Sequence, residues 1–295
     1  MESEVPLLER PYAQRRLIVV VDDAAAEVER QVLYEAQRQA QHQAVQDGDT
    51  VQEGINWAKV AKAAMEAPLI LFGGYGAKII VEAVQEQLKS TNELRDRGVP
   101  VLTVARSEAA NLTFPVGHPR DGVLYAGHPA VPNVYYTAAL FHRLTFEHKF
   151  SEAVQILMAL GATQFEVEHV TGWSSQFAAS LNVPLPTAGV QAGAEVGGSR
   201  ASTSQILYTA TLSGTEHPAL PENLVWYPYE PTWKQIVDGR LKYGLQDFSL
   251  TVRYEEDFGI NAGLKLSVQQ VGIDLGGKFE DHQPTIWRIS GKFAG

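Results

Sequence analysis

The sequence predicts an α+β or α/β protein. Its N-terminal α/β part should hold a short parallel sheet with flanking helices, and its C-terminal part should be β-rich, an antiparallel sheet or sandwich with one helix. Two observations carry this prediction. Before residue 183, short apolar runs alternate with segments of helical period, and after residue 187 apolar and polar residues alternate with period two between turn residues. A Pro-containing extended segment and a stretch rich in small residues separate these parts, so we expect domains at 1–183 and 187–295.

Composition narrows the class of protein. With 295 residues, 45% hydrophobic and 20% charged, the chain can bury a substantial core. A formal net charge of −10 without a long basic run argues against general nucleic-acid binding, and the lack of cysteine excludes disulfides and thiolate chemistry. The first residues lack the pattern of a secretory signal, and the longest apolar run, 67–77, is too short to span a membrane. We therefore expect a soluble, cytoplasmic, acidic protein.

The N-terminal part opens with a continuous β-branched run, Leu17–Val21, which predicts a buried strand. An amphipathic helix is expected over 24–46 and a second one over 51–66. Asp22 and Asp23 stand where they can cap the first of them.

A βαβ unit is predicted next. Leu69–Phe72 reads as a strand, a glycine loop and a helix over 77–88 follow, and 99–104 reads as the parallel partner strand. Residues 69–80 fit one buried helix broken at the glycines as the alternative.

The stretch 112–173 carries five of the eight histidines. Glycines and prolines divide 115–132 into turns around a short strand at Val123–Tyr125, and Asn133 is expected to cap a helix that runs toward Gly161. Gly161 fits a left-handed helix end, so that a strand can begin at once at Gln164.

The C-terminal part should consist of strands, apart from one helix over 232–243 that ends at Gly244. The strands are expected where alternation is regular: 206–212, 248–254, 264–268, 271–275 and 287–289.

The same stretch, 112–173, supplies the candidates for catalysis, which point to a hydrolase. These candidate residues are His118, His128, His148, Glu166, Glu168 and His169. Glu166 and Glu168 should project from one strand face about 7 Å apart, a spacing compatible with paired acid and base. The histidine spacing matches no metalloprotease motif, so no metal site is expected. The alternative is that the His–Pro pairs form rigid turns, the glutamates face solvent, and His169 is a hydrogen-bonded inward residue.

A phosphate or nucleotide site is the other candidate. Gly73, Gly74 and Gly76 follow a predicted strand, and Lys78 adds a positive charge at the start of the next helix. The spacing fits neither a P-loop nor a dinucleotide fingerprint, and a tight turn is the competing explanation.

Long amphipathic strands favour a non-enzymatic role. Residues 190–212 fit a hairpin of small, weakly alternating residues, and 260–279 fit a second amphipathic pair, which together suggest a conditionally membrane-active, pore-forming-like effector. We therefore expect a protein that acts by assembly or partner interaction, through self-association or a protein partner, with membranes reached under a trigger and no cofactor or nucleic acid. A hydrolase and a phosphate-binding module remain as alternatives.

Overall fold

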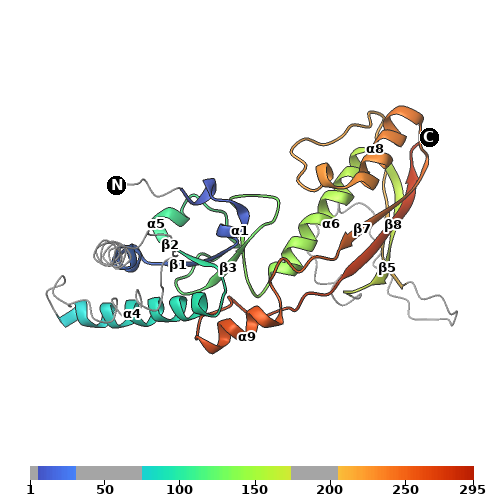
Figure 1. Cartoon of the computed structure of the whole chain (residues 1–295). Helices are drawn as coiled ribbons and strands as arrows, with labels where there is room; N and C mark the ends of the chain where they lie inside the picture. Colours follow the sequence, from blue (N-terminus) through green and yellow to red (C-terminus); the bar gives the residue numbers. More distant parts are fainter. Residues whose placement is uncertain (1–5, 31–74, 174–204) are drawn as a thin grey trace, which may run out of the picture. The chain divides into compact units, whose positions relative to one another are not determined.

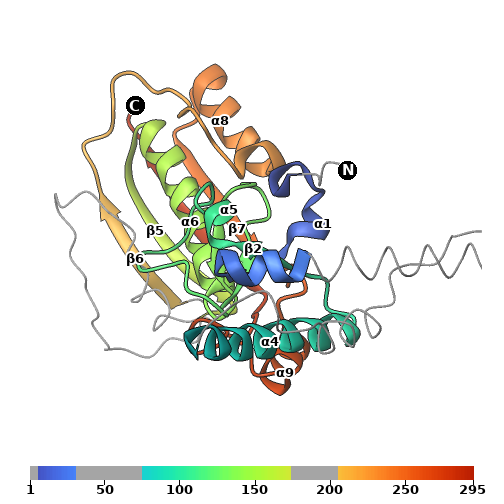
Figure 2. The same ribbon diagram turned by 90° about the vertical axis from the view of Figure 1, so that its left-hand side faces the viewer.

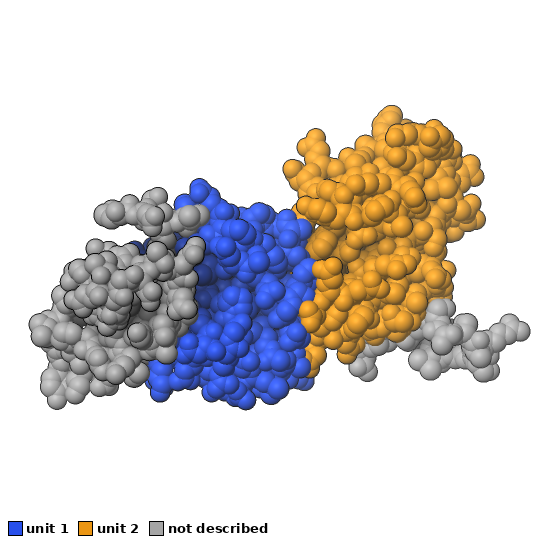
Figure 3. Space-filling view, in the orientation of Figure 1, with its two compact units in different colours: residues 1–141, 258–280 blue, residues 142–257, 281–295 orange. Residues whose placement is uncertain are grey.

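The computed structural model describes residues 6–30, 75–173 and 205–295. Contacts divide the chain into two compact units (Figure 3). Unit 1 comprises Met1–Phe141 and Phe258–Glu280, and unit 2 comprises His142–Asp257 and Asp281–Gly295. The chain therefore leaves unit 1 after Phe141, returns at Phe258 and leaves again after Glu280.

These units are composed differently from the two domains expected from the sequence. The expected boundary at 183–187 lies outside the described residues. The helix and strand between residues 141 and 171, expected in the N-terminal domain, belong almost wholly to the unit of the C-terminal strands, because that strand hydrogen-bonds to two of them. Conversely, Phe258–Glu280 joins the N-terminal unit.

Unit 1 contains a mixed four-stranded sheet (Figure 1). Its strands are β1 (Leu17–Val21), β2 (Val101–Ala105), β3 (Leu124–Gly127) and β4 (Tyr135–Thr137). They lie in the order β2-β1-β3-β4; β1 and β2 are parallel, and the other two pairs are antiparallel. The parallel pair confirms the expected short parallel sheet, although its first strand is β1; residues 69–72 lie outside the described residues.

The apolar run of β1 is buried on both faces of this sheet, as its composition predicts. Leu17, Val19 and Val21 face one core, which also holds side chains of α4 and α9, and Ile18 and Val20 face the other. The helices and turns of unit 1 are η1 (Leu7–Glu9), α1 (Tyr12–Arg15), a helical segment over 23–30, α4 (Tyr75–Asp96), α5 (Arg106–Ala109) and α9 (Ala262–Gln270).

Unit 2 contains an antiparallel four-stranded sheet. Its strands are β5 (Ala162–Thr171), β6 (Gln205–Thr211), β7 (Asp247–Tyr254) and β8 (Thr285–Phe293). They lie in the order β6-β5-β8-β7, so the last strand of the chain pairs with two earlier ones (Figure 2). The α+β class expected from the sequence is confirmed.

Two helices and a short turn complete unit 2: α6 (Phe141–Ala159), whose first residue belongs to unit 1, α8 (Pro231–Tyr243) and η3 (Tyr227–Tyr229). Phe146 and Phe150 of α6 pack edge-on against Trp287 of β8, so α6 lies against the apolar face of the sheet. Gly161 and Gly244 follow their helices at φ of +87° and +66°. These values confirm the left-handed helix end expected at Gly161 and the helix end expected at Gly244.

Three expected elements are wrong. No helix begins at Asn133; Tyr135–Thr137 form β4, and the helix begins at Phe141 and continues through Ser151. Leu264 and Val268 lie one helical turn apart in α9, whose N-terminus Asn261 caps through its side chain, so 264–268 is not a strand.

Residues 271–275 do not form a strand either. Val271, Ile273 and Leu275 are buried in the core of unit 1 as a loop, which pairs with Val123 through the isolated bridge of Asp274. Because every second residue of this loop is apolar and buried, its sequence has the period of two that is typical of a strand. The second amphipathic pair expected over 260–279 is therefore α9 and this loop.

Candidate functional site

The carboxyl ends of the parallel strands β1 and β2 bring polar residues together, as parallel strands commonly do. Asp22 Oδ1 accepts from the Ala25 N–H at 2.8 Å and so caps the helical segment that follows β1, as expected. Asp23 Oδ1 accepts from the backbone N–H and the hydroxyl of Ser107 at 3.0 and 2.6 Å. These two hydrogen bonds hold the pKa of Asp23 below its ordinary value and fasten the chain after β1 to the chain after β2.

His118 lies near this edge and is bound to Tyr125 of β3. Its Nδ1 lies 2.7 Å from the Tyr125 hydroxyl, which also accepts the Arg120 N–H at 2.8 Å. Because the hydroxyl proton is then free to point at Nδ1, this geometry suits a neutral His118. Burial lowers the pKa of His118 and the Arg120 charge lowers it further, with Asp274 opposing. The arrangement fixes the turn over 115–122 to the sheet.

His128 is a structural residue. Its side chain is buried, and its Nδ1 accepts the backbone N–H groups of Ala130 and Val131 at 3.1 and 3.0 Å. A ring nitrogen that accepts two backbone hydrogen bonds is tied to its turn. The interpretation of this His–Pro pair as a rigid turn agrees with these contacts.

The remaining catalytic candidates lie in unit 2. Glu166 and Glu168 face away from α6 on β5, and Glu168 pairs with Arg288 of β8 at 3.5 Å. His169 Nε2 lies 3.0 Å from the Gly172 carbonyl oxygen, so the inward, hydrogen-bonded alternative describes it. His148 is partly buried on α6, where burial lowers its pKa and the nearby Glu152 carboxylate opposes the shift.

The six candidates therefore fall into both units: His118 and His128 in unit 1, the others in unit 2. Across the described part of the chain, no group of three or more metal-ligating side chains occurs. Gly73 and Gly74 of the phosphate candidate lie outside the described residues, and Gly76 and Lys78 lie in the first turn of α4.

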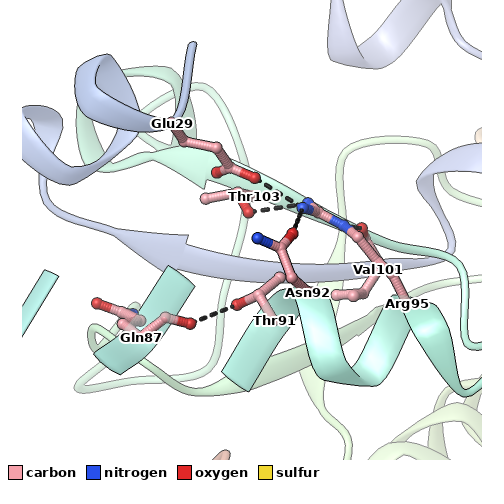
Figure 4. Close-up of polar contacts among 7 residues, drawn as sticks. All are labelled: Glu29, Gln87, Thr91, Asn92, Arg95, Val101 and Thr103. Atoms are coloured by element: carbon pink, nitrogen blue, oxygen red, sulfur yellow. Dashed lines mark hydrogen bonds and ion pairs between the residues drawn. The ribbon is translucent and has the colours of Figure 1, made fainter. Parts of the chain in front are cut away.

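Arg95 of α4 is a largely buried charge of unit 1 that donates several hydrogen bonds (Figure 4). Its guanidinium donates to Glu29 at 2.7 Å, Asn92 at 2.9 Å, Thr103 at 3.0 Å and the Val101 carbonyl at 2.9 Å. The Arg95 and Glu29 side chains are only 11% and 10% exposed. This network joins α4, β2 and the helical segment after β1, so it serves the fold.

A comparable buried anion in unit 2 is Glu152 of α6. Its carboxylate accepts the N–H groups of Val225, Trp226 and Tyr227 at 2.6, 2.8 and 2.7 Å. One helical turn earlier, Lys149 forms an ion pair with Glu230 and lies over the Trp226 ring at 5.2 Å. No sequence pattern indicates that Glu152 binds these groups, because its partners are more than 70 residues away in the chain.

The two edges of the unit 2 sheet differ. At the β7 edge, the fully buried Trp233 of α8 donates its indole N–H to the Thr251 carbonyl at 3.3 Å, so α8 covers part of this edge and takes up one carbonyl of the strand. At the other edge, β6 pairs only with β5 within the described residues (Figure 2). An open strand edge is a site where another strand can add.

Ile206 marks the open edge with an apolar side chain that is 56% exposed. Its register partners are Glu168 and, across β5, Arg288, so it belongs to the polar face of the sheet that points away from α6. Ile206 is therefore an exposed apolar side chain among charged residues on this face of the sheet.

None of the described helices is both long and apolar enough to cross a bilayer. Comparison with known proteins found no matching family model, curated protein or solved structure.

Proposed function

We propose that this protein acts without catalysis, by assembly, and that the open edge strand β6 of unit 2 is the assembling element. The observation that carries the proposal is the asymmetry of the unit 2 sheet: α8 covers part of one edge and bonds to a carbonyl of β7, whereas β6 at the other edge has a sheet partner on one side only within the described residues. The hydrolase alternative has less support, because its candidate residues are divided between two units and engaged in structural contacts.

The composition of β6 supports strand addition. Its sequence, QILYTAT, contains no charge, proline or glycine and is rich in β-branched and aromatic residues. Soluble proteins usually protect an edge strand with lysine, proline or a bulge on that strand. β6 has neither lysine nor proline, and its one irregularity is a register shift against Val167 and Glu168 of β5 that leaves Leu207 as an extra residue. Seven uncharged residues of high β propensity are instead the composition that pairs readily with another strand.

The partner is a second copy of the chain. A chain with a net charge of −10 repels its own copies, so self-association favours a surface without charge, and β6 offers one. Antiparallel pairing of β6 with β6 of the second copy about a two-fold axis would extend each four-stranded sheet into a continuous sheet across the dimer.

Single cysteines test this pairing directly, because the chain contains none of its own. Ile206→Cys, Thr209→Cys and Thr211→Cys share the polar face of β6. We expect at least one of them, the one nearest the two-fold axis, to form an intermolecular disulfide under mild oxidation at micromolar concentration. Ser249→Cys, exposed on β7 at the edge that α8 partly covers, is the matched control and should stay monomeric. Equal cross-linking at β6 and β7, or none at β6, would refute the proposal.

A charge at the open edge should prevent assembly. Ile206→Lys places an ammonium at an exposed position, so the monomer should keep its fold while light scattering after gel filtration shows loss of the dimer. Dye release from liposomes by the wild-type protein, abolished in Ile206→Lys, would show that the assembly is membrane-active. Cross-linking without dye release would show that the protein assembles in solution without permeabilising the liposomes.

A further inference from the structure

A buried histidine, a partly buried histidine and a tyrosine converge in unit 2 from three places in the chain. His142 lies on α6 and is fully buried, Tyr254 ends β7, and His282 lies three residues before β8 begins. The ring centroids are 4.9 Å apart for His142 and His282, 5.9 Å for His142 and Tyr254, and 5.6 Å for Tyr254 and His282. No hydrolytic or metal-binding motif accounts for this triangle.

The two histidines of the triangle differ in their hydrogen bonds. His142 Nδ1 lies 2.9 Å from the Tyr254 hydroxyl. His282 Nε2 is buried and has no hydrogen-bond partner among the described residues. A neutral imidazole can leave one nitrogen as an unprotonated acceptor at modest cost, whereas an imidazolium must donate from both nitrogens.

Protonation is opposed by the surroundings. Three titratable groups face His282: His142 from α6, Tyr254 from β7, and Asp257 from the connection after β7. Burial lowers the pKa of His282, and the Asp257 carboxylate compensates only in part. Two imidazolium rings at this separation, partly shielded from water, would also repel each other.

The triangle also connects the ends of two strands. Tyr254 pairs in register with Thr285, the first residue of β8, and its ring stacks on Trp173 with centroids 5.8 Å apart. The indole N–H of Trp287 donates to the Trp173 carbonyl at 3.1 Å. Displacement of His282 would therefore loosen one end of the β7–β8 pair and move two tryptophans.

We infer that His142, Tyr254 and His282 form an acid-sensitive lock in unit 2, closed while both imidazoles are neutral. A histidine with a lowered pKa in the folded state stabilises the fold fully above its ordinary pKa of about 6.5. That stabilisation is lost as pH falls through 6.5 toward the lower folded value, because the unfolded chain takes up the proton first. Acidification should open the lock.

The experiment measures thermal unfolding by tryptophan fluorescence from pH 7.5 to 5.5 in the full chain. In the wild type, the melting temperature of unit 2 should fall with acidification. The variant His282→Gln, which cannot be protonated, should lose most of that fall, and His142→Gln should reduce it. His217→Gln is the control, because His217 is exposed in the loop before η3 and should leave the acid dependence of the wild type unchanged.

Imidazole proton resonances of the wild-type protein give a second measurement that requires no variant to fold. The His282 resonance should titrate below the ordinary histidine pKa of about 6.5. An acid dependence of His282→Gln equal to that of the wild type, or titration of His282 at or above about 6.5, would overturn the inference. Both measurements are independent of the pairing of β6, so a failure of the assembly proposal leaves them interpretable.

Discussion

Single buried side chains fix much of this fold, and Glu152 shows how. It lies on α6, is 5% exposed, and accepts hydrogen bonds from three consecutive backbone N–H groups of the segment that leads into η3. Charge-assisted hydrogen bonds of this kind are stronger than neutral ones, and their donors are costly to leave unpaired. These hydrogen bonds hold the segment that leads into η3 against α6.

Replacement of this carboxylate should destabilise unit 2. In Glu152→Gln, one amide oxygen remains as an acceptor, but the new NH₂ group faces a backbone donor. We expect the free energy of unfolding to fall by about 2–3 kcal/mol, measured by urea denaturation. Gln155→Ala, exposed on the same helix, should change it by less than about 0.5 kcal/mol. Equal effects of the two variants would show that the Glu152 carboxylate adds nothing.

Histidines show why candidate sites were harder to predict than folds. His118 and His128 are adjacent to prolines, and their contacts lie within their own turns or on the neighbouring strand, as local sequence allows. The pair of His142 and His282 is separated by 140 residues, so no spacing rule reports it. Convergence of distant residues depends on the register of β7 and β8, which periodicity leaves open.

At the scale of elements, alternation with period two predicted β6, β7 and β8 correctly but also suggested a strand at Leu264–Val268. Leu266 is 58% exposed there, whereas Leu264 and Val268, four residues apart, are buried. A short segment with apolar residues at every second position also satisfies the helical spacing of four. The side chain of Asn261, which caps α9, was the signal that distinguishes the two.

Gly291 of β8 lies where two strands approach each other closely. It lies in β8 opposite Phe165 of β5, where a Cβ would overlap the Gln164 carbonyl and lie 2.8 Å from the Phe165 Cα. A glycine inside an alternating strand often marks such close approach of two backbones. The pairing of β5 with β8 therefore depends on the missing side chain.

Gly291→Ala should force these strands apart. We expect a loss of about 3 kcal/mol or more in unfolding free energy, seen as a lowered melting temperature by circular dichroism. Gly239→Ala is the matched control, because Gly239 lies inside α8 and its added Cβ would meet the flexible end of Leu245 at 3.2 Å. Comparable melting of the two variants would contradict the close approach.

The whole molecule consists of two units whose segments are interleaved in the chain. Sequence reasoning placed a single boundary where composition changes, near 183–187. Composition reports local preference, whereas the units follow long-range pairing of β5 with β8 and burial of 271–275 against β1. This part of the organisation could not be predicted from one sequence.

Truncation after Glu280 separates the units by experiment. The shortened chain keeps every segment of unit 1 but loses β8, which lies between β5 and β7. Hydrogen exchange should show protected amides in β1, as in the full chain, and rapid exchange in β5 and β7. Loss of protection in both units would mean that they fold as one.

The central position of β8 also orders events during synthesis. β5, β6 and β7 leave the ribosome long before residues 285–293, yet only β6 and β5 can pair without β8. The apolar side chains of α6 and β7 that pack against Trp287 remain exposed, or bound by a chaperone, until residues 285–293 have been synthesised. Every segment of unit 1 has been synthesised once Glu280 is added, so we expect unit 1 to be complete first.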